Sequence, residues 1–104
     1  MFMQIFNLIF AHFLMDYPLQ GDFIGRFKNR HVKSVGVPWY HLMIAHAWMH
    51  AGAVMFITDN PIFALIELIV HFFTDCAKCE GWINIHVDQA IHIGCKIAYA
   101  YYWF

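Results

Sequence analysis

The sequence predicts an all-α fold, a bundle of four transmembrane helices that run up, down, up and down. The 104-residue chain is 62% hydrophobic, 19% aromatic and only 12% charged, whereas a typical soluble domain has roughly 25% charged residues. Turn residues divide the apolar sequence into segments of about 17–22 residues, and about 20 residues cross a hydrocarbon core of roughly 30 Å. Every segment also carries ionisable residues spaced four apart. The length favours one integral-membrane domain over residues 1–104.

Helix-breaking residues set the expected boundaries. Pro18 and Gly21 close the first segment, and Asp59-Asn60-Pro61 forms a tight turn whose proline suits the start of the next helix. Residues 21–38 are the most hydrophilic stretch, and we expect mainly a loop there, with at most a short helix around 23–27. The four expected helices span residues 2–19, 39–58, 62–78 and 83–103.

The basic residues predict an orientation. They gather between the first two helices and at the end of the third, at Arg26, Lys28, Arg30, Lys33 and Lys78. The positive-inside rule then places these ends in the cytoplasm of a bacterial inner membrane, with both termini outside the cytoplasm. The terminal stretch 99–104 would form an aromatic belt at the outer interface.

Paired ionisable residues recur in all four helices. The pairs are His12 with Asp16, His46 with His50, His71 with Asp75, and Asp88 with His92. At 1.5 Å per residue, one histidine of each helix lies roughly 12 Å from its cytoplasmic end. Histidine precedes aspartate in the first and third helices and follows it in the fourth, as helices of opposite direction require. We therefore expect one layer of imidazoles and carboxylates.

Such a layer predicts a metal site, with these eight residues as candidate ligands. Imidazole and carboxylate groups suit a divalent ion, zinc first, with iron or manganese as alternatives. The set exceeds the needs of one tetrahedral ion, so either two ions share it or some residues orient the ligands. Asp16 or Asp88, left outside the ligand shell, is a candidate catalytic base. A proton or ion relay and purely structural His–Asp pairing are alternatives.

Four further polar residues are candidates for supporting roles. Glu67 lies one turn before His71, where it is either a deeper ligand or a buried protonated acid. Gln20 and Gln89 suit hydrogen bonding to ligands or substrate. Lys78 either holds an anion or extends its ammonium to the interface.

Other reactive residue types receive weaker assignments. Cys76 and Cys79 form a CxxC pair that we interpret as packing residues rather than a metal or redox site. Lys96 is expected at the interface, and His31 and His86 at the surface.

The four linked motifs resemble a known family. They are His12-Phe-Leu-Met-Asp16-Tyr-Pro-Leu-Gln20, His46-Ala-Trp-Met-His50, His71-Phe-Phe-Thr-Asp75-Cys-Ala-Lys78 and Asp88-Gln89-Ala-Ile-His92. In this order they are similar to an uncharacterised family of bacterial and phage membrane proteins, catalogued as domain of unknown function 3307 (DUF3307). The resemblance spans most of the chain and implies no established activity.

The leading functional hypothesis is a membrane-embedded, metal-dependent hydrolase. Its expected partners are membrane lipid and an anionic head group or lipid-linked phosphate at the cytoplasmic leaflet. One alternative is a metal or proton transport component, and another is a non-enzymatic phage or accessory membrane protein with a structural metal. A net charge of −1 without a basic face argues against nucleic acid, and a homo-oligomer is left open.

Overall fold

The structure of the chain, a computed structural model, describes residues 2–33 and 36–102, and its regular secondary structure there is helical throughout. The helices are α1 (Phe2–Asp16), α2 (Gly21–Phe27), α3 (Trp39–Thr58), α4 (Pro61–Cys79) and α5 (Ile85–Tyr102). The fold is all-α as expected, but these described parts of the chain form five helices rather than four.

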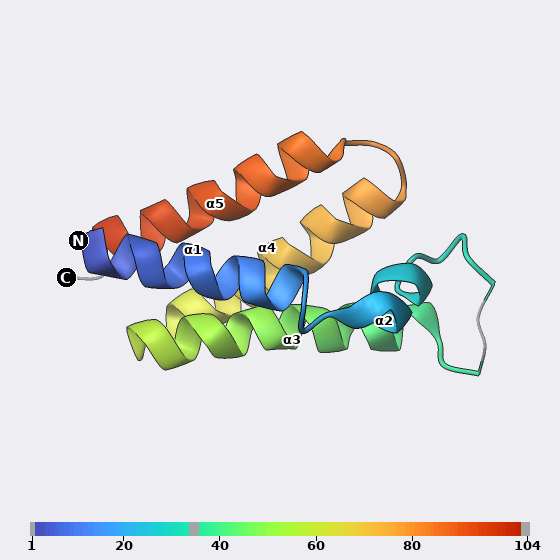
Figure 1. Cartoon of the computed structure of the whole chain (residues 1–104), viewed down its shortest axis with the longest axis horizontal. Helices are drawn as coiled ribbons and strands as arrows, with labels where there is room; N and C mark the ends of the chain where they lie inside the picture. The colour runs from blue at the N-terminus through green and yellow to red at the C-terminus, as the bar shows by residue number, and fades with distance from the viewer. Residues whose placement is uncertain (1, 34–35, 103–104) are drawn as a thin grey trace.

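The four long helices form a bundle, and the chain as a whole is elongated, with extents of 44 × 23 × 22 Å. Figure 1 shows that successive long helices run in opposite directions, so that the start of α1 and the end of α5 lie at one end and α2 lies at the other. Helix α1 packs on α3 and α5, α4 packs on the same two helices, and α2 covers α3. This ring of contacts brings one face of each long helix to a common interior.

Residues 17–21 form a corner, although the predicted first helix includes residues 17–19. Helix α1 ends at Asp16, before the expected limit of residue 19. Pro18 has no N–H to continue the helical pattern, and the Leu19 N–H instead reaches the Leu14 carbonyl at 3.1 Å. Gly21 adopts a φ of 74°, which turns the chain into α2. The stretch expected to be mainly loop therefore begins with a helix that folds back on α3.

The turn between α3 and α4 follows its local sequence. Asp59 adopts a left-handed φ of 53°, which ends α3. The Asn60 side chain accepts hydrogen bonds from the backbone N–H groups of Ile62 and Phe63, and Pro61 occupies the first turn of α4. Aspartate tolerates this backbone region, and asparagine is a preferred N-cap, so local chemistry fixes this corner.

Helix α5 starts later than expected. It begins at Ile85 rather than residue 83, and the Asn84 side chain accepts a hydrogen bond of 2.9 Å from the Val87 N–H. The expected end at residue 103, and residues 103 and 104 of the proposed aromatic belt, lie outside the described residues.

The expectation of membrane-spanning helices is wrong for the described chain. Within residues 2–33 and 36–102, no helix is at once long enough and apolar enough to cross a membrane. Helix α1 has 15 residues, which gives a length of about 22 Å against a hydrocarbon core of roughly 30 Å. Helix α4 is longer but includes Glu67, Asp75 and Lys78. Three further predictions depended on such spans and are wrong for the same reason: the integral placement in a bacterial inner membrane, the termini outside the cytoplasm, and the cytoplasmic basic loop.

The interior of the bundle is mainly polar. The apolar core is a small cluster near one end, formed by Leu8, Val54, Tyr99 and Ala100. Many large apolar side chains instead face outward, and Phe56 is 91% exposed. The buried polar residues are His12, Lys28, His46, His50, Thr58, Glu67, His71, Asp75, Asp88, His92 and Lys96. Since burying polar groups costs free energy unless they are paired, the partners of these residues determine what the interior can do.

Candidate metal centre

Five buried imidazoles meet between the four long helices. His12 comes from α1, His46 and His50 from α3, His71 from α4 and His92 from α5. The ring of His71 stacks between two others, with centroids 3.7 Å from His50 and 4.1 Å from His92. The common layer expected from the spacing of these residues is present in the structure.

Asp16 supplies the carboxylate at the centre of this layer. Its Oδ1 atom lies 3.1 Å from the Nε2 atoms of both His46 and His50, and 3.7 Å from Nε2 of His71. Asp16 is the last residue of α1, so the end of this helix carries the carboxylate toward α3 and α4. Three imidazole nitrogens from two helices therefore point at one carboxylate oxygen from a third.

These distances match the ligand shell of a single metal ion. The four candidate ligand atoms of Asp16, His46, His50 and His71 all lie within 4.8 Å of one another. Zinc binds nitrogen and oxygen at about 2.0–2.2 Å, so two ligand atoms of a tetrahedral site lie roughly 3.3 Å apart. The observed contacts of 3.1 Å, 3.1 Å and 3.7 Å bracket this value. The three contacts between Asp16 and the histidines therefore already have about the spacing of ligands around one ion.

Burial keeps the imidazoles of His50 and His71 in the neutral form that binds metal. Burial lowers the pKa of His50 to about 3, and with the neighbouring histidines it lowers the pKa of His71 well below its usual value. For Asp16, burial acts to raise the pKa, but hydrogen bonds from His46 and His50 outweigh it and hold the pKa far below the usual range. Neutral imidazole and ionised carboxylate are the species that coordinate metal.

A carboxamide links the central carboxylate to the other groups of the layer. The Gln89 Nε2 atom donates to Asp16 Oδ2 at 2.8 Å and to Asp88 Oδ2 at 3.1 Å, while its Oε1 atom lies 2.9 Å from Nε2 of His12. Asp88 Oδ1 in turn lies 3.2 Å from Nε2 of His92. Three buried residues therefore lie around the central set but are not among its four candidate ligands: His12, Asp88 and His92.

Asp75 is separated from the central set by lysine. Lys28 of the segment after α2 is buried and donates to Asp75 Oδ2 at 2.5 Å and to Gln20 Oε1 at 2.6 Å. Lys78 approaches Asp75 Oδ1 at 3.2 Å. Asp75 Oδ2 is still 3.6 Å from Nε2 of His46. Lysine neutralises this carboxylate, which makes it a poorer metal ligand than its spacing suggested.

A second group of potential ligands lies on the other side of His71. The ligand atoms of Glu67, His71 and His92 are within 4.8 Å of one another. Glu67, however, is already paired with the buried Lys96, which donates to Glu67 Oε1. The structure therefore contains one ligand set without a lysine and one with a lysine.

Lys28 and Lys96 are the two residues of the site that sequence reasoning missed. The sequence predicts Lys28 in a cytoplasmic basic loop and Lys96 at the interface, yet both are buried. Lys96 lies one turn after His92, and Glu67 lies one turn before His71. This spacing places each residue on the same helix face as its histidine, which indicates that both point into the layer. Lys28 offered no such signal, because it reaches the site only through the fold-back of α2.

The remaining candidates lie away from the metal layer. Cys76 and Cys79 are free thiols of intermediate exposure, and burial raises the pKa of Cys76 to about 11. They line a cavity of about 380 Å³ whose wall also includes Lys28. His86 is exposed, and His31 pairs with Glu80 at the surface.

The fold and site define an all-helical protein with a buried histidine–carboxylate centre assembled from four antiparallel helices. The chain belongs to the family described as "Protein of unknown function (DUF3307)", whose family model matches residues 4–104. This match confirms the resemblance drawn from the four motifs. No curated protein and no solved structure matches the chain.

Proposed function

We propose that the chain binds one divalent metal ion, zinc first, through Asp16, His46, His50 and His71, and that it is a metal-dependent hydrolase. The observation that carries this proposal is the convergence of three imidazole Nε2 atoms on Asp16 Oδ1 at 3.1–3.7 Å. Iron and manganese accept the same donor atoms and remain alternatives to zinc.

The charges of the interior support a divalent cation. Four carboxylates lie in or beside the layer, at Asp16, Glu67, Asp75 and Asp88. Among the described residues, Lys28 and Lys96 are the buried cations. This leaves two negative charges when the imidazoles are neutral, or one when the partly exposed Lys78 is included. Buried charge without compensation is unfavourable, and one divalent ion beside Asp16 supplies the compensation.

The unpaired nitrogens of His71 support the same conclusion. Neither ring nitrogen of His71 has a hydrogen-bond partner within the described parts of the chain, and the residue is 1% exposed. Leaving a buried polar atom unsatisfied costs about 1–3 kcal/mol. Coordination of an ion through Nε2 would satisfy the atom that already faces Asp16.

Hydrolysis is favoured by the acid–base groups that remain after the ligands are assigned. A structural ion needs only its ligands, but His12, Asp88 and His92 are buried around this set as well. Burial lowers the pKa of His12, and residues with a perturbed pKa concentrate at functional sites. A bound ion would activate water and polarise a phosphate or acyl ester, with Asp88, held by Gln89 and His92, as the base. Asp16, the alternative base, is better placed as a ligand.

A structural ion is the second candidate function. Three histidines and one aspartate fill a tetrahedral shell, as in structural zinc sites, whereas catalytic sites keep one position open. The exposed edge of Asp16, whose side chain is 11% exposed, is the route by which water could still reach the ion. Under this candidate the metal holds α1, α3 and α4 together and supports no turnover.

Metal analysis tests the binding step. Purified protein should contain about one equivalent of zinc, iron or manganese after incubation with each ion and desalting. His46→Ala and His50→Ala should lose it, and His86→Ala, which removes an exposed histidine, should keep it. A folded wild-type protein that stays metal-free after loading would contradict the proposal.

Turnover separates the enzyme from the structural ion. With p-nitrophenyl phosphate and p-nitrophenyl acetate as probes, a hydrolase should lose activity on chelation and regain it with zinc. Asp88→Asn should keep the metal and lower kcat about 10²–10⁴-fold. Metal-loaded protein that hydrolyses neither ester but is destabilised by chelation would favour the structural ion.

A further inference from the structure

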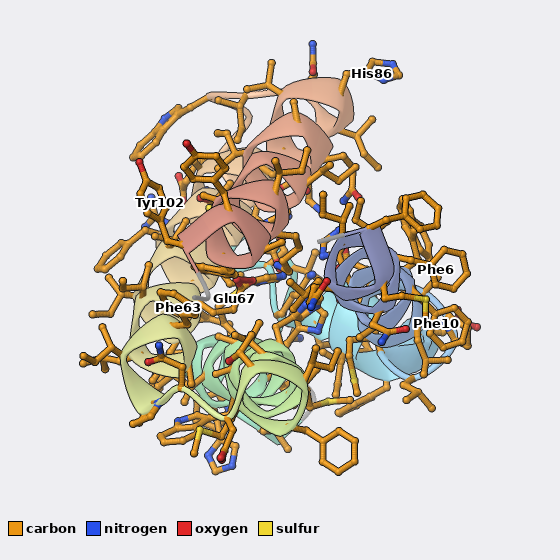
Figure 2. All side chains as sticks on the ribbon, turned by 90° about the vertical axis from the view of Figure 1, so that its left-hand side faces the viewer. Phe6, Phe10, Phe63, Glu67, His86 and Tyr102 are labelled. Carbon is orange, nitrogen blue, oxygen red and sulfur yellow. The ribbon has the colours of Figure 1, made fainter. Side chains whose placement is uncertain are left out.

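The second ligand group, Glu67, His71 and His92, has the composition of a metal site but already contains a cation. Its ligand atoms lie within 4.8 Å of one another, and all three residues are 1% exposed. Figure 2 shows Glu67 inside the bundle, whereas Phe6, Phe10 and His86 lie at its outer rim. One carboxylate and two imidazoles would suit a divalent ion as well as the first set does.

Lys96 occupies this group. It lies one turn after His92 on α5, is 1% exposed and donates to Glu67 Oε1. A lysine so deeply buried needs a carboxylate partner, and Glu67 is the carboxylate that the structure pairs with it. The ammonium is therefore held against one of the two carboxylate oxygens that a metal ion bound to Glu67 would use.

We infer that Lys96 limits the interior to one divalent ion by filling the second cation position with its ammonium group. This inference rests on the proposed function, because it assumes that the first set binds an ion. An ammonium group and a divalent ion repel each other strongly in a poorly hydrated interior. His71, stacked between His50 and His92, belongs to both sets, so the two candidate cation positions lie next to each other.

The second position retains unused donor atoms, as expected where a lysine replaces a metal. Glu67 Oε2 and both ring nitrogens of His92 have no hydrogen-bond partner among the described residues, although His92 Nε2 is 3.2 Å from Asp88 Oδ1. Tyr99 is close by, and burial together with the charge of Glu67 raises the pKa of its hydroxyl. The ammonium pairs with one oxygen of Glu67 and leaves the other oxygen without a partner among the described residues.

Removal of the lysine charge tests the inference. Zinc-loaded wild-type protein should hold one ion per chain, and Lys96→Met, which keeps the length of the side chain, should hold two. Lys96→Arg retains the charge and should hold one. The double variant Glu67→Gln/Lys96→Met lacks the carboxylate and should return to one. Elemental analysis measures the ratio, cobalt absorption reports each site, and circular dichroism verifies folding.

The outcomes separate this inference from the proposed function. A wild-type protein without metal defeats the proposed function and the inference with it. One ion in both wild type and folded Lys96→Met overturns only the inference. If Lys96→Met does not fold, Lys96→Gln provides the neutral side chain for the same measurement. A wild-type ratio of two that falls to one in Glu67→Gln also overturns it, since the lysine would then fail to exclude an ion.

Discussion

Asp16 is the residue that every proposed ligand histidine faces. Its two oxygens have different partners: Oδ1 meets His46 and His50, and Oδ2 accepts from Gln89. One side chain thus joins the ligand set to the acid–base groups around it. Its position at the end of α1 leaves the carboxylate partly accessible, unlike the buried histidines.

We expect Asp16→Asn to weaken zinc binding at least about 100-fold, because the neutral amide is a poor ligand and loss of even supporting groups costs 10–100-fold. Competition with a chelator of known affinity measures the change. Asp22→Asn, at an exposed position of α2, is the matched control and should bind zinc as the wild type does. Equal affinities of the two variants would remove Asp16 from the site.

Gln89 is expected to act through the residues that it orients. Replacing it with leucine deprives Asp16 and Asp88 of a donor and His12 of an acceptor. The variant should unfold about 1–3 kcal/mol more easily and bind zinc about 10–100-fold more weakly. Urea unfolding and chelator competition measure these effects, with the exposed Ala90→Leu as control. Unchanged zinc affinity would show that this carboxamide does not support the site.

At the scale of elements, the turn between α3 and α4 positions His50 and His71 relative to each other. Asn60→Ala removes the acceptor of the Ile62 and Phe63 N–H groups and should lower the free energy of unfolding by about 1 kcal/mol. Asn60→Asp preserves the cap and should remain close to wild type. Guanidinium unfolding compares the three proteins. If alanine and aspartate behave alike, the cap does not stabilise this corner.

Helix α2 has a role that its length does not suggest. By folding back on α3, it delivers Lys28 to Asp75 and Gln20. That ammonium neutralises Asp75 and leaves Asp16 as the carboxylate that faces His46, His50 and His71 without a lysine. The element expected to be mainly loop therefore selects which carboxylate of the layer is available to a metal.

For the whole molecule, the buried histidines predict a loss of stability in mild acid. Burial lowers the pKa of His50 to about 3, and the pKa values of His12 and His71 are lowered mainly for the same reason. Between these values and about 6.5, the unfolded chain binds more protons than the folded one, so stability falls as the pH falls. The depressed pKa values of Asp16 and Asp75 affect stability only below about 4, where these carboxylates would ordinarily protonate.

Metal-free protein should therefore lose at least about 2 kcal/mol of unfolding free energy between pH 7 and pH 5, at about 1.4 kcal/mol per pH unit for each histidine. Urea unfolding followed by circular dichroism at pH 7, 6 and 5 measures it. His86→Ala should show the same loss, since His86 is exposed. A stability that stays constant over this range would mean that the layer is hydrated or protonated in the folded protein.

The sequence alone determined the helical class, the family, and the histidines and aspartates of the polar layer. Helical periodicity fixes which of these side chains share a face. The four-residue spacing of His46 and His50, and the reversed order of His and Asp on antiparallel helices, required no knowledge of packing. The tertiary structure decided which carboxylates pair with lysine and which face the histidines. Lys28 and Lys96 neutralise Asp75 and Glu67, and Asp16 is left to the histidines. Periodicity places a residue on a face, but only folding brings a lysine from a distant segment within bonding distance of its partner, as α2 does for Asp75. Apolar composition likewise suggested membrane spans, whereas the length of α1 and the charges along α4 argue against them.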